Sequence, residues 1–361
     1  MTIARMLAAL AFAASIAAGP AVAQDAKAPD PRAVIAAVQA LPPEGIDELK
    51  AIDIGGVKQW ISVRGANRKN PILLYIHGGP GSPMMPESWT FQRPWEDYFT
   101  VVEWDQRGAG KTFAAAGGKP DASITIDRMQ ADAEEVIQYL RKTYGQDRIF
   151  LVGHSWGSVL GVRVAQHHPE WLYAYIGIGQ LIDGRLNEEV GYRETLAEAG
   201  RVGNADAVKE LKAIAPYPDP DEGKMLQKVV AERKWDVALG GMAYAHSDES
   251  FEDGVRAMSP QYNDGDLRAY EKGEMVSVMT LLPELVGVDF RHTTRFECPV
   301  FIFAGAHDRT TPESLVETWF ATVQAPKKRL FKLDQSAHMV VNEQPGEVLV
   351  DLATEVRPLA H

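Results

Sequence analysis

Short runs of consecutive apolar residues recur along the chain and are separated by longer amphipathic segments. Within each run almost every side chain is apolar, so that apolar and polar positions do not alternate. Strands with this pattern are buried on both faces, as in a parallel sheet covered by helices. The runs predicted as strands are residues 72–76, 99–102, 149–152, 173–178 and 300–303.

Helical periodicity occupies the segments between several of these strands, as over residues 126–144 and 159–167. Strands that alternate with helices predict an α/β fold with a doubly wound, mostly parallel sheet. From residue 181 to 290 the strand pattern is absent, and several prolines interrupt a charged, helical sequence. We therefore predict that residues 181–290 form a helical cap inserted into one α/β core, made of residues 52–180 and 291–361.

The first residues have the features of a signal peptide, predicted as residues 1–23. Arg5 precedes an apolar run, and Ala21-Val22-Ala23 supplies small residues for cleavage before Gln24. The apolar run is shorter than the roughly 20 residues that cross a bilayer. We therefore expect an exported protein, periplasmic or secreted, with no membrane anchor after cleavage. Residues 24–51, with a helical run at 32–41, form a predicted N-terminal extension.

Composition and charge narrow the class of partner. The chain of 361 residues is 45% hydrophobic and 24% charged, as in ordinary soluble globular proteins. Its formal net charge of −12, with both signs mixed along the chain, argues against nucleic acid and anionic membranes, because these require a basic surface. We expect a small-molecule or short-peptide substrate.

The strongest chemical signal is Gly153-His154-Ser155-Trp156-Gly157, directly after a predicted strand and before a predicted helix. This G-x-S-x-G pattern in a strand-turn-helix context is typical of a nucleophile elbow. The turn is so tight that the positions two before and two after the serine must be glycine. Ser155 is therefore the predicted nucleophile, held at a helix N-terminus that favours developing negative charge.

A serine nucleophile needs a general base that is itself oriented by a third group. In folds that present serine on such an elbow, the acid and then the histidine follow in the chain. His338 follows a strand-like segment and is the predicted base. Asp308, after the predicted strand at 300–303, is the predicted acid, and Asp334 is the alternative.

Acyl transfer also needs N–H donors for the tetrahedral oxyanion. The backbone N–H of Trp156, directly after the nucleophile, is one predicted donor. The second is the N–H of Gly79, in the loop His77-Gly78-Gly79-Pro80-Gly81 that follows the strand at 72–76. Adjacent glycines let the main chain approach the site without an intervening side chain.

No metal or cofactor is predicted. The sequence has no H-E-x-x-H motif, and its glycine pattern fits neither a P-loop nor a dinucleotide fingerprint. The only cysteine, Cys298, has no partner within the chain. It stands at the start of a predicted strand, which indicates a buried structural thiol.

Taken in order, these motifs resemble the proline iminopeptidase branch of the α/β hydrolases, a family similar to serine peptidase family S33. The resemblance covers the core and not the cap, and it rests on His77–Gly81, Trp104–Gly110, the elbow, Gly305–Asp308 and His338. It implies the triad Ser155, Asp308 and His338, the oxyanion donors Gly79 and Trp156, and a bracing role for the loop 105–110. The Trp-x-x-Trp-Glu cap segment that holds the substrate's amino group in this family is not found.

The resemblance implies an aminopeptidase that cleaves short peptides or amino-acid amides through an acyl-enzyme. Glu188, early in the cap, is the predicted carboxylate for a substrate ammonium. Two alternatives remain open: a periplasmic carboxylesterase for small lipophilic esters or lactones, and a non-catalytic binding protein on the same fold.

Overall fold

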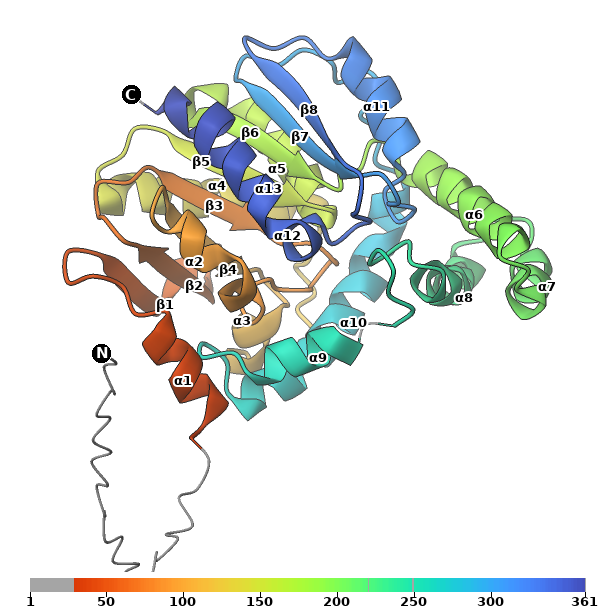
Figure 1. The fold of residues 1–361 in the computed structure, drawn as a ribbon, viewed down its shortest axis with the longest axis horizontal. Helices are drawn as coiled ribbons and strands as arrows, with labels where there is room; N and C mark the ends of the chain where they lie inside the picture. Colours follow the sequence, from red (N-terminus) through yellow and green to blue (C-terminus); the bar gives the residue numbers. More distant parts are fainter. Residues whose placement is uncertain (1–28, 220, 249, 361) are drawn as a thin grey trace, which may run out of the picture.

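The computed structural model describes residues 29–219, 221–248 and 250–360. They form an eight-stranded sheet in the order β1-β2-β4-β3-β5-β6-β7-β8, with helices on both faces (Figure 1). β2 pairs antiparallel with β1 and β4, and the other neighbours are parallel. The predicted α/β fold with a mostly parallel sheet is confirmed. The strands are β1 (Ile46–Ile54), β2 (Val57–Gly65), β3 (Ile72–Ile76), β4 (Thr100–Asp105), β5 (Ile149–His154), β6 (Leu172–Ile178), β7 (Val300–Gly305) and β8 (Lys328–Leu333).

The apolar runs predicted as strands are the central strands of the sheet. All side chains of β3, β4, β5 and β7 are buried. Their continuous apolar character therefore has the expected cause, which is a cover of helices on both faces. The carboxyl ends of these parallel strands meet at one edge of the sheet, and the loops that leave this edge carry most of the predicted site residues.

The start of the core differs from the sequence prediction. β1 begins at Ile46 and pairs along its whole length with β2, so residues 46–51 belong to the sheet and not to an N-terminal extension of residues 24–51. The reason is the exposure of this edge strand. Only three of the nine β1 side chains are buried, and the segment therefore lacks the apolar run by which the other strands were recognised.

Two apolar layers hold the helices to the sheet. One packs α4, α5 and α11 against the sheet and includes Met129, Val159 and Trp319. The other packs α2, α12 and α13 against the opposite face and includes Trp95 and Val348. The helices outside the cap are α1 (Pro31–Val38), α2 (Gln92–Trp95), α3 (Gly110–Ala115), α4 (Ile126–Tyr144), α5 (Trp156–His167), α11 (Glu313–Thr322), α12 (Val340–Glu343) and α13 (Pro345–Asp351), with short 3-10 helices at Ser88–Thr90, Pro169–Trp171 and Arg357–Leu359 and a π-helix at Leu352–Val356.

Between β6 and β7 the described residues form helices, within the segment predicted as a cap. α6, α7 and α8 extend to one side of the sheet, and α9 and α10 run below the strand ends in the view of Figure 1. α10 packs against the core helix α3. The cap helices are α6 (Gly184–Arg201), α7 (Ala205–Ala213), α8 (Glu222–Ala238), α9 (Ser250–Ala257) and α10 (Asp264–Val286).

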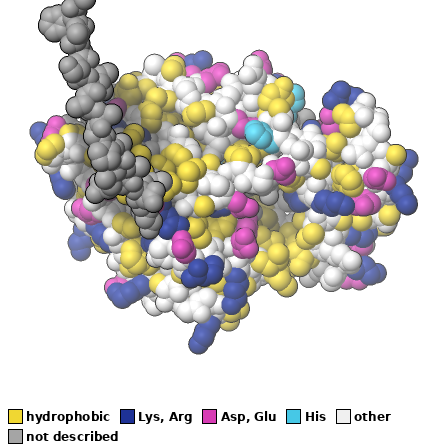
Figure 2. Space-filling view, turned by 60° about the horizontal axis from the view of Figure 1, so that its bottom comes forward, with side chains coloured by type: hydrophobic (Ala, Val, Ile, Leu, Met, Phe, Trp, Pro, Cys, Tyr) yellow, Lys and Arg dark blue, Asp and Glu magenta, His cyan; other side chains and the backbone are white. Residues whose placement is uncertain are grey.

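The N-terminal helix α1 is hydrogen-bonded to the cap. The Arg32 guanidinium donates to the Ala257 carbonyl at 3.0 Å and to the Asp264 carboxylate at 2.6 Å. The predicted signal peptide, residues 1–23, lies outside the described residues and stays a prediction. Among the described residues, no helix combines the length and apolar character needed to span a membrane. Acidic and basic side chains are interspersed over the face seen in Figure 2.

Candidate active site

Ser155 lies at the sharp turn between β5 and α5. Its backbone has φ 53° and ψ −121°, in the left-handed region that a non-glycine residue rarely adopts. A Cβ on Gly157 would lie 2.1 Å from the Ile76 carbonyl oxygen, and one on Gly153 would lie 2.6 Å from the Gly157 carbonyl oxygen. Both glycines are therefore required by close backbone approach, and the turn has the form of a nucleophile elbow.

The structure brings His338 and Asp308 together on the loops after β8 and β7. His338 Nδ1 lies 2.8 Å from Asp308 Oδ2, and both side chains are buried. Thr311, which the sequence did not indicate, donates to Asp308 through its backbone N–H and its hydroxyl, both at 2.7 Å. Asp334, the alternative acid, is exposed. These contacts hold the Asp308 carboxylate beside the His338 imidazole.

Ser155 and His338 line the same cavity, of about 200 Å³. Gly78 and Gly79 line it as well, and a Cβ on Gly78 would lie 3.0 Å from Ser155 Cβ. The predicted nucleophile, base and glycine loop therefore face one space at the carboxyl edge of the sheet.

The two predicted oxyanion donors belong to segments that flank this cavity. Gly79 has φ 103°, a conformation that favours glycine. Trp156 is the first residue of α5, and N–H groups in the first turn of a helix have no acceptor within it. In the loop before Gly79, His77 Nδ1 lies 2.9 Å from the Gly78 carbonyl oxygen.

His154, inside the elbow, packs against the predicted base. Its Nε2 lies 3.2 Å from the His338 carbonyl oxygen, and the two ring centroids are 5.0 Å apart. Burial lowers the pKa of His154 to about 3, and the charge of His338 acts in the same direction. His154 is therefore neutral near pH 7 and adds no positive charge beside His338.

The same cavity is also lined by charged residues that the sequence did not single out. Arg256 pairs with Glu87 at 2.7 Å and with Glu252 at 3.2 Å. Glu274, from α10, accepts a hydrogen bond from the Ser82 hydroxyl at 2.5 Å, and burial raises the pKa of its carboxyl above the ordinary 4.5. No local motif marks these residues, because they come from three segments, the loop that contains Glu87, α9 and α10, that only the fold brings together. All four line the cavity with Ser155.

Glu188 does not line this cavity. It is buried within the cap, where Arg233 donates to it at 2.5 Å and the Tyr217 hydroxyl donates to it as well. The structure therefore places the predicted ammonium ligand in an ion pair between α6 and α8. A carboxylate already matched by a guanidinium is a poor partner for a substrate cation.

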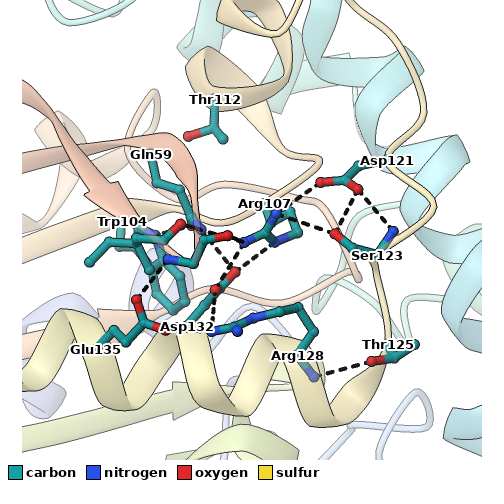
Figure 3. A network of polar contacts seen from close by, with 12 residues as sticks. Gln59, Trp104, Arg107, Thr112, Asp121, Ser123, Thr125, Arg128, Asp132 and Glu135 are labelled. Atoms are coloured by element: carbon teal, nitrogen blue, oxygen red, sulfur yellow. Dashed lines mark hydrogen bonds and ion pairs between the residues drawn. The ribbon is translucent and has the colours of Figure 1, made fainter.

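The loop 105–110 connects the site to the core below it. The Arg107 guanidinium binds Asp132 of α4 through two contacts, at 2.8 and 3.0 Å, and Asp121 at 2.9 Å. It also donates to the Gly55 carbonyl at 3.0 Å. Figure 3 shows this network between α4, the loop and the first hairpin. These contacts fix the backbone on the carboxyl side of β4.

The described residues contain no group of three or more His, Cys, Asp or Glu side chains that could hold a metal ion. Cys298 is buried at the start of β7, and burial raises the pKa of its thiol to about 11.

Comparison with known proteins places these features in a family. Residues 71–345 match the family described as the alpha/beta hydrolase fold. A probable aminopeptidase, YbaC of Bacillus subtilis, is 28% identical over 299 residues, which cover 82% of this chain and 92% of that protein. A proline iminopeptidase of Neisseria gonorrhoeae is 30% identical over 155 residues, 43% of this chain and 46% of that protein.

Two solved structures show the same fold at low identity. The proline iminopeptidase of Mycobacterium smegmatis superposes with a TM-score of 0.60 at 18% identity, over 86% of this chain and 98% of that one. An esterase from Exiguobacterium antarcticum superposes with a TM-score of 0.53 at 16% identity, over 85% and 99%.

Proposed function

Because this chain belongs to the α/β-hydrolase fold family, we propose that it is a serine hydrolase that cleaves amide bonds next to a free amino group. One observation carries the proposal. Ser155, on its strained turn, faces the same cavity as His338, whose Nδ1 lies 2.8 Å from Asp308. The relatives named as aminopeptidase and proline iminopeptidase support the same class of reaction.

In this mechanism the neutral His338 imidazole accepts the Ser155 hydroxyl proton as the serine oxygen attacks the substrate carbonyl. Asp308 keeps the proton on His338 Nδ1 and stabilises the imidazolium that forms. The N–H groups of Gly79 and Trp156 bind the oxyanion. His338 then protonates the leaving amine, and water releases the acyl group from Ser155 by the same steps in reverse order.

The charges in the cavity support a substrate with a free amino group. Three carboxyl groups and one guanidinium line it, so negative charge exceeds positive charge when all are ionised. Arg256 is engaged by Glu87 and Glu252, whereas Glu274 accepts a hydrogen bond from the neutral Ser82 hydroxyl. We infer that Glu274, rather than Glu188, binds the substrate ammonium.

The test compares amine and neutral substrates. Purified protein is assayed on proline and alanine naphthylamides and on a short-chain nitrophenyl ester. Glu274→Gln should lower kcat/KM on the naphthylamides by about two orders of magnitude, because a desolvated ammonium loses its partner. Ester hydrolysis should change by less than about threefold, since the ester brings no charge to the cavity. Glu271→Gln, an exposed carboxylate on the same helix, is the matched control.

Ser155→Ala should abolish both activities, and a fluorophosphonate should label Ser155 in the wild-type protein. If the wild-type protein cleaves esters and no amide, the result would favour the carboxylesterase function over the aminopeptidase function. A folded protein with neither activity nor labelling would contradict the hydrolase and favour a binding protein. Equal losses on both substrates in Glu274→Gln would remove the ammonium role from Glu274.

A further inference from the structure

Gln106, in the loop after β4, joins the two segments that carry the proposed oxyanion donors. Its side chain is fully buried. The amide Nε2 donates to the His77 carbonyl at 3.0 Å, and the amide Oε1 accepts from the Trp156 indole Nε1 at 3.0 Å. One side-chain amide thus connects the glycine loop to the nucleophile elbow.

His77 links Gln106 to the peptide between Gly78 and Gly79, which contains one proposed donor. The Gln106 backbone N–H donates to His77 Nε2 at 3.3 Å, so in the neutral imidazole the proton is on Nδ1, which donates to the Gly78 carbonyl at 2.9 Å. Burial lowers the pKa of His77 to about 4, which keeps the ring neutral. The Gly78 carbonyl and the Gly79 N–H belong to one planar peptide. Fixing the direction of the carbonyl therefore fixes the direction of the N–H.

The neighbours of Gln106 hold it in a rigid loop. Arg107 is bound on several sides in the network of Figure 3. On the other side, the Asp105 carboxylate accepts from the Lys111 N–H at 2.7 Å and from the Tyr262 hydroxyl. Gln106 is thus presented from a fixed backbone toward both the glycine loop and the nucleophile elbow.

We propose that Gln106 is a positioning residue that sets the distance and direction of the two oxyanion donors, through His77 on one side and the Trp156 indole on the other. This inference rests on the proposed function. The negative charge that these donors bind develops only in the transition state, so misplacing them should lower kcat and leave KM nearly unchanged. Loss of a whole oxyanion donor costs about two to three orders of magnitude in kcat. Displacement of a donor should cost less.

The experiment measures kcat, KM, thermal stability and the affinity of a substrate-like trifluoromethyl ketone, which forms an oxyanion when Ser155 adds to it. Gln106→Met preserves the length of the side chain and removes both amide contacts. It should lower kcat by about tenfold to a hundredfold, change KM by less than about threefold, and weaken the ketone in proportion to kcat. Gln106→Met with unchanged kcat, or with unchanged ketone affinity, would overturn the inference.

A second buried glutamine supplies the matched control. Gln59 accepts from the Trp104 indole at 2.9 Å and donates to Asp132 at 2.8 Å. It makes the same kind of bridge, but within the network of Figure 3 and not between the two segments that carry the proposed donors. Gln59→Met should lower thermal stability and leave kcat within about twofold of wild type. An equal loss of kcat in both variants would assign the effect to general destabilisation.

Trp156→Phe keeps the backbone donor and removes only the indole N–H, so it tests the same link if Gln106→Met does not fold. It should also lower kcat with little change in KM. The double variant should be no slower than the slower single variant, because Gln106→Met already removes the contact that Trp156→Phe removes. Fully additive losses would contradict the link. A wild-type protein with no hydrolase activity would defeat the proposed function instead, whatever these variants do.

Discussion

At the scale of single residues, Asp308 and Asp334 differ in what surrounds them. Asp308 is buried, contacts His338 Nδ1 and accepts two hydrogen bonds from Thr311, whereas Asp334 is exposed. Asp308→Asn should lower kcat by about three to four orders of magnitude, because the amide no longer selects the right tautomer. Asp334→Asn should leave kcat within about twofold. The measurement is steady-state kinetics on one ester, and a larger loss in Asp334→Asn would reverse the assignment.

Glu274 predicts a pH dependence that only amine substrates share. Burial raises the pKa of this carboxyl above 4.5, so it becomes protonated at a higher pH than an exposed glutamate. The protonated form cannot attract an ammonium, and KM for the naphthylamides should therefore rise as the pH falls through the raised pKa. KM for a neutral ester should stay flat over the same range. If KM for both substrates rose together as the pH fell, the result would argue against ammonium binding by Glu274.

The sequence alone predicts the site residues whose roles depend on local backbone geometry. Ser155 and its two glycines lie within five consecutive positions, and the tight turn requires them whatever the rest of the chain does. Glu274 and the partners of Gln106 are different, because their surroundings come from segments far apart in the chain. Glu188 shows the same limit, since nothing near it in sequence indicated that Arg233 would bind it.

At the scale of elements, the end of α8 and the turn after it contact both loops that carry the proposed acid and base. Asp236 accepts from the Thr310 hydroxyl at 2.7 Å, next to Asp308. The Met242 carbonyl accepts from the backbone N–H groups of His338 and Met339 at 3.0 and 3.2 Å. The cap therefore supports the alignment of Asp308 with His338 as well as covering the site.

Removing this support should affect stability and rate together. Asp236 is buried and also pairs with Arg309 at 3.3 Å, so Asp236→Ala should lower the free energy of unfolding by about 3 kcal/mol. kcat should fall by about tenfold, since the loop that carries Asp308 loses an anchor. Urea unfolding and ester kinetics measure the two effects. Asp206→Ala, at an exposed position of α7, should change neither, and full activity in Asp236→Ala would show that the cap contact does not align the triad.

The elements also show where pattern reading succeeds and where it fails. Strands buried on both faces, such as β3 and β5, are continuous apolar runs and were predicted. β1 has three buried side chains among nine and was missed, because a half-exposed edge strand resembles surface sequence. Its partner β2 was missed with it, although five of its nine residues are buried, since polar residues interrupt its apolar positions.

At the scale of the whole molecule, the cap segment separates Ser155 from Asp308 and His338 along the chain. Ser155 precedes α6, whereas Asp308 and His338 follow α10. The parallel order of β5, β6, β7 and β8 brings the three residues to one edge of the sheet. This arrangement could be predicted from the strand pattern alone, because consecutive parallel strands present their carboxyl ends together. The path of the cap helices could not, since their packing depends on side chains spread over about a hundred residues.

The position of Cys298 has a consequence for following this protein in solution. It is the only cysteine, and it is buried two residues before the start of β7, which lies between β6 and the edge strand β8. A thiol reagent can reach this buried side chain only when the surrounding structure opens. The native thiol is also unreactive, because the thiolate is the reactive form and burial raises the pKa of the thiol to about 11. At pH 8 the native protein should resist alkylation, and in urea it should take up one label per chain. Asp236→Ala should be alkylated faster than wild type, and rapid labelling of the native wild type would contradict the buried placement. The rate of this alkylation thus measures how often the structure around the start of β7 opens.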